Sequence, residues 1–173
     1  MSEQPFRPER QTFLVHADGT EEYGVLPEWW GALGSDVQSR SLRFSDDGEV
    51  WLDEGQIPAS LQAAGCILTE VVGVSDFGGV AHPSLDVGRR VLLQPEPANP
   101  SDPGAISVWV GDASEVVGYL PGALAADIRR EAERRGTGYG AFVAAEERDA
   151  ASHERRGLSI MLGPGLVWAK EVG

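Results

Sequence analysis

The chain has 173 residues, which is enough for one domain of ordinary size or for a small domain with an appended subdomain. Its 14 Lys and Arg residues against 27 Asp and Glu residues give a formal net charge of −13, which repels a phosphate backbone, whereas typical nucleic-acid binders carry a basic surface. Because Cys66 is the one cysteine, an intramolecular disulfide is excluded, and Cys66 fits the role of a small buried apolar residue.

Membrane and secretion signals are missing from the sequence. No apolar run approaches the length of a membrane span, and residues 1–5 lack the basic region and the apolar stretch of a signal peptide. We therefore expect a cytoplasmic protein. Among the basic residues only Lys170 is a lysine, and this bias, together with the many Ala and Gly residues, suggests a GC-rich bacterial genome.

Residues 1–64 are expected to form an acidic, hairpin-rich N-terminal subdomain, since they carry 4 basic and 12 acidic side chains. Short apolar runs flank Asp-Gly and Asp-Asp-Gly, which are typical hairpin turns. Pro27 permits a helical turn with Trp29 and Trp30, and residues 58–64 favour another helical turn. The strands expected here are 11–15, 22–26, 42–44 and 49–52.

Residues 65–173 are expected to form a second domain of short strands with one helix, which is the pattern of an antiparallel barrel or sandwich. A glycine-rich loop is expected at 75–86. Pro121 and Gly122 stand where a helix should start and Gly136 where it should end, so the helix covers about 122–135. The expected strands are 66–74, 89–94, 105–110, 115–120, 139–147, 157–162 and 166–172.

The expected helix has one apolar face and one charged face. Leu124, Ile128 and Ala132 follow the helical repeat and should be buried. The arginines of this helix alternate with acidic residues, which favours a solvated face over a track of phosphate contacts. They are Arg129, Arg130, Arg134 and Arg135.

No pattern in the chain indicates catalysis or a metal site. His16, His82 and His153 lie far apart and match no metal-ligand spacing, and the single cysteine has no nucleophile motif beside it. A phosphate-binding glycine motif is also missing. We therefore expect a non-enzymatic protein without cofactor or metal. Solvated charges are expected at Asp46, Asp47, Glu146, Glu147, Arg155 and Arg156.

The loop at 96–104 is the most distinctive stretch of the second domain. Three prolines among residues 97–103 fix φ and remove backbone donors, so neither a helix nor a central strand can continue through them. Asn99 and Asp102 are residue types that hydrogen-bond nearby backbone amides. The loop is therefore either a purely structural turn or a rigid mount for a binding site.

Together with other stretches in a fixed order, this loop resembles the HIRAN family over about residues 65–163. The most specific pieces are the proline loop itself and the Val-Gly-Tyr-Leu-Pro stretch that follows it. The resemblance implies a small OB-like or SH3-like β-barrel with one packed helix, free-standing in bacteria or fused to helicases and nucleases. The matching stretches are 71–74, 90–93, 96–108, 117–121 and 124–125.

The resemblance also implies a ligand, because the best-understood eukaryotic members bind the 3' end of single-stranded DNA. In these members a carboxylate accepts a hydrogen bond from the terminal 3'-hydroxyl group, and aromatic rings stack on bases. Asp102 matches the carboxylate and Asn99 matches the loop that holds it. Ser101 stands where the family has a stacking tyrosine, so an interaction of roughly 1–3 kcal/mol per base is lost there. Phe77 is the stacking group that remains in the first loop.

Several of these residues also fit a purely structural role. The residue types favour Asp102 as a cap of its own turn over a binding role, and Tyr119 as a core residue with its hydroxyl group at the rim. Arg89 and Arg90 point to opposite faces of one strand, so only one of them can contact a phosphate in a groove.

Two functions remain open. The first is a non-catalytic module that binds single-stranded DNA 3' ends weakly, alongside a separately encoded DNA-processing enzyme. The second is a regulatory module that has lost DNA binding and whose acidic residues 1–64 recognise a basic protein. For the first function the candidate binding residues are Phe77, Arg89, Arg90, Asn99, Ser101, Asp102 and Tyr119.

Overall fold

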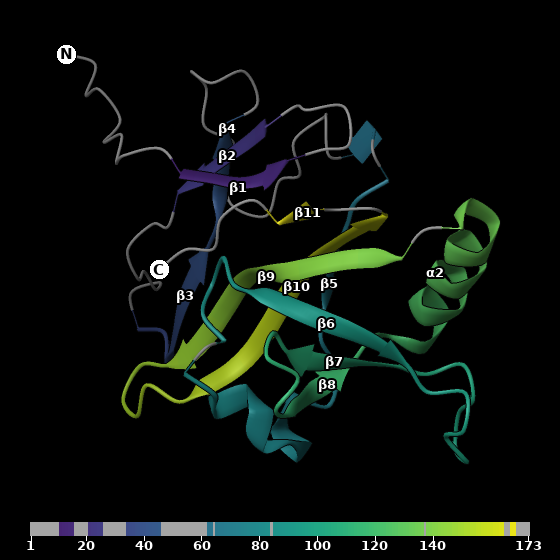
Figure 1. Cartoon of the computed structure of the whole chain (residues 1–173). Coiled ribbons are helices and arrows are strands. Elements are labelled where there is room, and N and C mark those ends of the chain that lie inside the picture. The colour runs from purple at the N-terminus through teal and green to yellow at the C-terminus, as the bar shows by residue number, and fades with distance from the viewer. Residues whose placement is uncertain are drawn as a thin grey trace.

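Antiparallel strands make up most of the fold, as Figure 1 shows, and this confirms the expected mainly-β class. The computed structural model describes the backbone of residues 11–15, 21–25, 34–45, 62–63, 65–83, 85–136, 138–164 and 167–168. It describes side chains for residues 34–42, 62–63, 65–83, 85–136 and 138–164.

The larger sheet is seven-stranded, with the order β5-β10-β9-β6-β7-β8, and β3 pairs with β9 beside β6. Every pair in it is antiparallel. Its strands are β3 (Val37–Ser41), β5 (Ile67–Glu70), β6 (Arg90–Pro95), β7 (Ile106–Val110), β8 (Val116–Tyr119), β9 (Tyr139–Asp149) and β10 (Arg155–Pro164). Strand β3 was not expected from the sequence.

A bridge between the two ends of this sheet closes it into a barrel. Beyond β5, Val72 donates its amide to the Tyr119 carbonyl at 2.8 Å, and Tyr119 donates back to the Val72 carbonyl at 2.9 Å. The contact is so close that a Cβ atom added at Gly118 would lie 2.5 Å from the Val72 carbonyl oxygen. The glycine of the Val-Gly-Tyr stretch is therefore required by the closure of the barrel.

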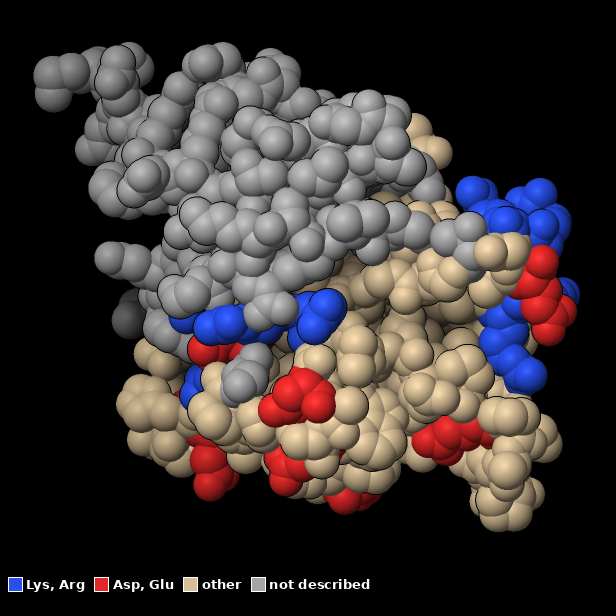
Figure 2. All heavy atoms as spheres, in the orientation of Figure 1, with Lys and Arg blue, Asp and Glu red and all other residues tan. Residues whose placement is uncertain are grey.

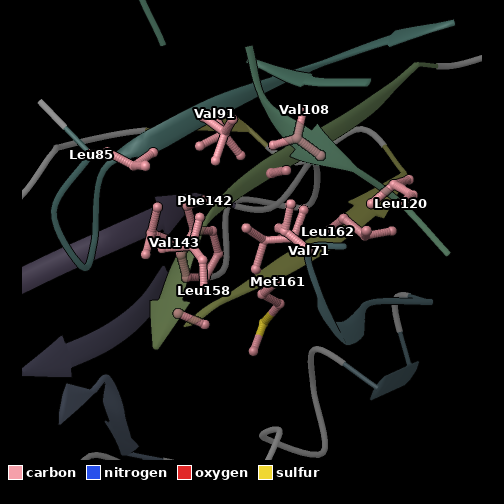
Figure 3. Packing of buried hydrophobic residues seen from close by; sticks show 14 of the residues in the cluster. Val71, Leu85, Val91, Val108, Leu120, Phe142, Val143, Leu158, Met161 and Leu162 are labelled. Atoms are coloured by element: carbon pink, nitrogen blue, oxygen red, sulfur yellow. The ribbon is translucent and has the colours of Figure 1, made fainter. Parts of the chain in front are cut away.

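Alternating apolar residues fill the barrel with a single core. In β7, Ile106, Val108 and Val110 point inward, and each is at most 2% exposed. Val91 and Val143 come from neighbouring strands and meet them in the same cluster. Figure 3 shows how side chains from β6, β7, β9 and β10 converge there.

One helix, α2 (Gly122–Arg135), packs on the barrel and ends at Gly136, as expected. Its buried residues are Ala125 and Ile128, whereas Leu124 and Ala132 are only half-buried. Ile128 is thus buried as expected, Leu124 packs against the core as a partly buried residue, and Ala125 adds to this face. In Figure 1, α2 lies at the end of the barrel to which the β6–β7 loop extends.

A smaller sheet has the order β11-β1-β2-β4 and contains three strands from the first part of the chain. Strand β3 pairs with β9, and β1 pairs with β11, so two strand pairs cross the proposed boundary at residue 64. The second arm of the hairpin expected at 42–52 lies outside the described residues, as do Trp29 and Trp30. The strands are β1 (Gln11–Val15), β2 (Glu21–Val25), β4 (Arg43–Ser45) and β11 (Val167–Trp168).

A buried ion pair corrects the expectation that Arg155 and Glu146 are solvated. Their side chains are 3% and 0% exposed, and Arg155 Nε lies 2.5 Å from Glu146 Oε2. Arg155 also donates to the Val80 carbonyl in the loop between β5 and β6, and its Nη2 lies 3.7 Å from Asp86 Oδ1. The β5–β6 loop thus contacts Arg155 at two points and helps to bury the pair.

Replacing Arg155 should therefore be far more destabilising than replacing its neighbour. Arg155→Met leaves the Glu146 carboxylate buried without its main partner, so we expect the free energy of unfolding to fall by about 3–5 kcal/mol. Arg156→Met breaks an exposed pair with Asp149 and should cost less than about 1 kcal/mol. Urea unfolding of both variants measures the difference, and equal effects would contradict the buried pair.

Candidate functional site

The loop between β6 and β7 is held by its own side chains. Asn99 Oδ1 accepts hydrogen bonds from the amides of Ser101 and Asp102 at 2.9 and 3.1 Å. Asp102 Oδ1 accepts from the Gly104 amide at 2.9 Å, so the capping role is real. The second oxygen of Asp102 accepts no hydrogen bond from the described part of the chain, and the residue is exposed. Capping and ligand contact are therefore compatible in Asp102.

Glu96 links this loop to β8. The Tyr119 hydroxyl group donates to both carboxylate oxygens of Glu96, at 3.0 and 3.2 Å, and Asn99 Nδ2 donates to Oε1 at 3.0 Å. The pKa of Glu96 is lowered from its ordinary value, mainly by the hydroxyl group of Ser107. Burial acts in the opposite direction, and the hydrogen bonds from Asn99 and Tyr119 lower the pKa further. Glu96 is therefore a carboxylate, not a carboxylic acid, at neutral pH.

An aromatic pair lies beside this carboxylate. The rings of Phe77 and Tyr119 are 5.8 Å apart with a tilt of 52°, which is within the range of favourable ring contacts. Burial, followed by the hydrogen bond to Glu96, raises the pKa of the Tyr119 hydroxyl group, so it stays protonated and remains a donor. Both rings are half-buried, so part of each faces solvent.

The segment that carries Phe77 lies directly on β8. It consists of two short 3₁₀ helices, η1 (Val74–Asp76) and η2 (Gly78–Ala81). A Cβ atom added at Gly79 would lie 2.2 Å from the Val116 carbonyl oxygen. Together with the hydrogen bond from Arg155 to the Val80 carbonyl, this contact fixes Phe77 against Tyr119.

The structure brings Phe77, Asn99 and Tyr119 together, with Ser101 and Asp102 exposed in the adjoining loop. The two arginines expected at the site lie elsewhere. Arg90 begins β6 at its other end, six residues before Glu96, which corresponds to about 20 Å in an extended strand. Arg89 precedes it and is half-buried, with its carbonyl accepting from the Val143 amide.

Sequence reasoning missed Glu96 and Trp109. Glu96 stands three residues before Asn99, a spacing that suits a turn contact, but its bond to Tyr119 joins positions 23 residues apart. Trp109 alternates with Ser107 along β7 on the face opposite the core, and its Nε1 donates to Ser107 Oγ at 2.8 Å. The period-two pattern of β7 already separated this face from the core.

A serine, a histidine and an aspartate meet near the β7–β8 turn, but not as a catalytic triad. His82 Nε2 lies 3.5 Å from Ser114 Oγ and 4.0 Å from Asp112 Oδ2. In a catalytic triad the serine contacts one ring nitrogen of the histidine and the aspartate contacts the other. Here Ser114 and Asp112 both lie near Nε2 of His82, so the arrangement is not that of a triad. Among the described residues, no group of three or more His, Cys, Asp and Glu side chains is arranged to hold a metal ion.

Charge is unevenly spread over the described surface. Figure 2 shows basic side chains over α2 and, as a second group, near the start of β6, with uncharged residues between them. On α2, Arg134 pairs with Glu131 at 2.7 Å and Arg130 pairs with Asp127, whereas Arg129 Nη1 donates to the Pro103 carbonyl of the β6–β7 loop at 2.9 Å. The expected solvated face is thus confirmed for Arg130, Arg134 and Arg135 and is wrong for Arg129, which is half-buried against the loop. No described helix is long and apolar enough to span a membrane.

Comparison with known families gives a match over more than half of the chain. The model of the HIRAN domain matches residues 64–162. One relative is the 3-hydroxy-4-methyl-anthranilyl-[aryl-carrier protein] 5-monooxygenase of Streptosporangium sibiricum, 34% identical over 90 residues, which are 51% of this chain and 23% of that enzyme. The chain therefore spans less than a quarter of this relative's length.

Two solved structures match part of the chain. The crystal structure of the HIRAN domain of human HLTF has 24% sequence identity and a TM-score of 0.42, with 58% of this chain and 77% of that chain covered. A protein from Lactobacillus plantarum has 24% identity and a TM-score of 0.41, with 58% and 97% covered.

The contact between η2 and β8 predicts that alanine substitutions at two neighbouring glycines change the free energy of unfolding by different amounts. Gly79→Ala puts a methyl group into the Val116 carbonyl and should lower the free energy of unfolding by about 1–3 kcal/mol. Gly78→Ala meets nothing closer than 3.9 Å and should change it by less than about 0.5 kcal/mol. Urea unfolding compares the two, and a Gly79→Ala variant as stable as Gly78→Ala would refute the close contact.

The lowered pKa of Glu96 predicts a pH-dependent stability difference. The carboxylate contributes fully above its ordinary pKa of 4.5, and the contribution is lost as the pH falls through the lower folded-state value. The stability of the wild type relative to Glu96→Gln should therefore shrink as the pH falls from about 6 to about 3. Urea unfolding at each pH measures this, with exposed Glu133→Gln as control. A constant difference would contradict the contacts of Glu96.

Proposed function

The chain belongs to the HIRAN domain family, and from this we propose that it is a non-catalytic module that binds the 3'-hydroxyl end of single-stranded DNA. The observation that carries the proposal is the meeting of one aromatic pair and two carboxylates around a rigid loop. Phe77 and Tyr119 supply the rings, while Glu96 and Asp102 supply the carboxylates.

The carboxylates favour one type of strand end. A terminal 3'-hydroxyl group can donate a hydrogen bond to the free oxygen of Asp102, whereas a terminal phosphate would place like charges together. Glu96 adds a second negative charge on the side of Tyr119. The site should therefore discriminate against strands that end in a 3'-phosphate.

The aromatic pair compensates in part for Ser101. Ser101 has no ring to stack on the terminal base, but the exposed parts of Phe77 and Tyr119 offer π-faces next to the same loop. Base–aromatic stacking tolerates any base, so we expect little sequence preference. With only one such pair and few cations beside it, the affinity should be weak and should depend modestly on salt.

The alternative function, a protein-interaction module that has lost DNA binding, gains no support from the family match. Of the two arginines, exposed Arg90 remains the proposed phosphate contact, at the far end of β6 from the terminal nucleotide, whereas Arg89 points to the other face.

Fluorescence anisotropy at low salt tests the proposal with two oligothymidylates labelled at the 5' end, one ending in a 3'-hydroxyl group and the other in a 3'-phosphate. We expect the hydroxyl end to bind about tenfold more tightly, in line with a hydrogen bond to a charged acceptor. Asp102→Ala should reduce this preference, and Phe77→Ala should weaken binding of both strands by about 1–3 kcal/mol.

Glu154→Gln serves as the control, because Glu154 is exposed in the turn between β9 and β10 and has no described side-chain contact. Equal affinity for the two strand ends, or no binding to either, would refute the proposed function.

A further inference from the structure

The face of the barrel that carries Tyr119 continues across β7 and β6. Tyr119 is paired with Ser107, and Trp109 is paired with both Val116 of β8 and Leu92 of β6. Directly opposite residues of antiparallel strands lie on the same face of a sheet. Trp109, Leu92 and Val116 therefore share the outer face with Tyr119, while the alternate residues of β7 fill the core.

Trp109 is a fixed ring on this face. Its Nε1 donates to Ser107 Oγ at 2.8 Å, and Ser107 Oγ lies 3.1 Å from the Gln94 carbonyl oxygen. Trp109 is half-buried and does not belong to the core cluster. Its orientation is set by a hydrogen bond along its own strand, so the ring is held in place without being enclosed.

The spacing of the rings suits consecutive bases. Trp109 lies two residues along β7 from Ser107, the partner of Tyr119, and a register shift between Val108 and Trp109 brings Val116 opposite Trp109. Phe77 lies 5.8 Å from Tyr119 and extends the row beyond β8. A single strand that stacks on Phe77 and Tyr119 would thus meet Trp109 next if it runs across the sheet.

Charged residues at the two ends of β6 bear on which way a strand would run along these rings. Glu96 and Asp102 lie at the end of β6 and in the loop after it, whereas exposed Arg90 lies at the start of β6, two residues before Leu92 on the same face. The uncharged end group of a strand fits the two carboxylates, and one of its phosphates fits Arg90.

We propose, on the basis of the proposed function, that Trp109 forms a second base-stacking subsite. It takes an internal nucleotide of a single strand whose 3' terminal nucleotide lies at Phe77 and Tyr119. Leu92 and Val116 flank the base, and Arg90 contacts a phosphate further from the end. Neither the family match nor the proline loop assigns this subsite, because it depends on the outer face of β7.

A series of octathymidylates tests the subsite with the full chain. Each strand ends in a 3'-hydroxyl group and has one base removed, at the terminal position or at one of the next three. Affinities are measured for the wild type and for Trp109→Ala, and each pair gives a double-mutant cycle between the ring and one base.

We expect Trp109→Ala to weaken binding of the intact strand by about 5-fold to 150-fold, the equivalent of 1–3 kcal/mol for one stacked base. The loss should disappear when one particular internal base is missing and should persist when the terminal base is missing. Trp109→Phe keeps a ring but loses the bond to Ser107, and it should restore most of the affinity. Circular dichroism verifies that both variants are folded.

The salt dependence of binding by Arg90→Gln is an independent test. If Arg90 contacts one phosphate, the slope of the logarithm of affinity against the logarithm of salt concentration should fall by about 0.7. Loss of Trp109 should leave this slope unchanged, because stacking releases no counterions.

Two failures are distinguishable. If strands with a 3'-hydroxyl group bind in preference to those with a 3'-phosphate but Trp109→Ala shows no coupling to any base, the subsite is refuted and the proposed function stands. If no strand binds, or if the two ends bind equally, the proposed function is refuted and the subsite with it.

Discussion

The contact between the β5–β6 loop and β8 is the constraint on which the candidate site depends. At Gly79 the loop backbone leaves no room for a side chain against the Val116 carbonyl, and Arg155 holds the next carbonyl, that of Val80. The buried Glu146 carboxylate holds Arg155 in turn. A buried charge pair beneath the loop therefore positions Phe77 on the surface of the barrel, next to Tyr119.

An acidic chain that binds a strand end must gain its free energy mainly from contacts other than phosphates. In the proposed binding mode, the rings of Phe77, Tyr119 and Trp109 would provide stacking, which is insensitive to charge, and the carboxylates of Glu96 and Asp102 would face the end group. The net charge of −13 disfavours general binding along a polyanion but is compatible with recognition of an uncharged terminus. The proposed selectivity for ends and the proposed low affinity both follow from this charge distribution.

Local patterns in the sequence were enough to predict the barrel strands, α2 and the proline loop, since these depend on alternation, helix-end residues and prolines. Strand β3 was missed because Val37 to Ser41 has little apolar alternation and is a strand through its pairing with β9. The burial of Glu146 and Arg155 was also missed, because it depends on a loop 75 residues away in the chain. Glu96 gained its role only when the fold placed Tyr119 beside it.

The most direct measurement of the central claim is a titration of the isotopically labelled protein with a short oligothymidylate ending in a 3'-hydroxyl group, followed by amide and ring NMR signals. The account predicts that the largest shifts occur at Phe77, Tyr119 and the loop from Asn99 to Asp102, and that they continue to Trp109. Shifts confined to the arginine face of α2, or spread evenly over the barrel, would contradict it.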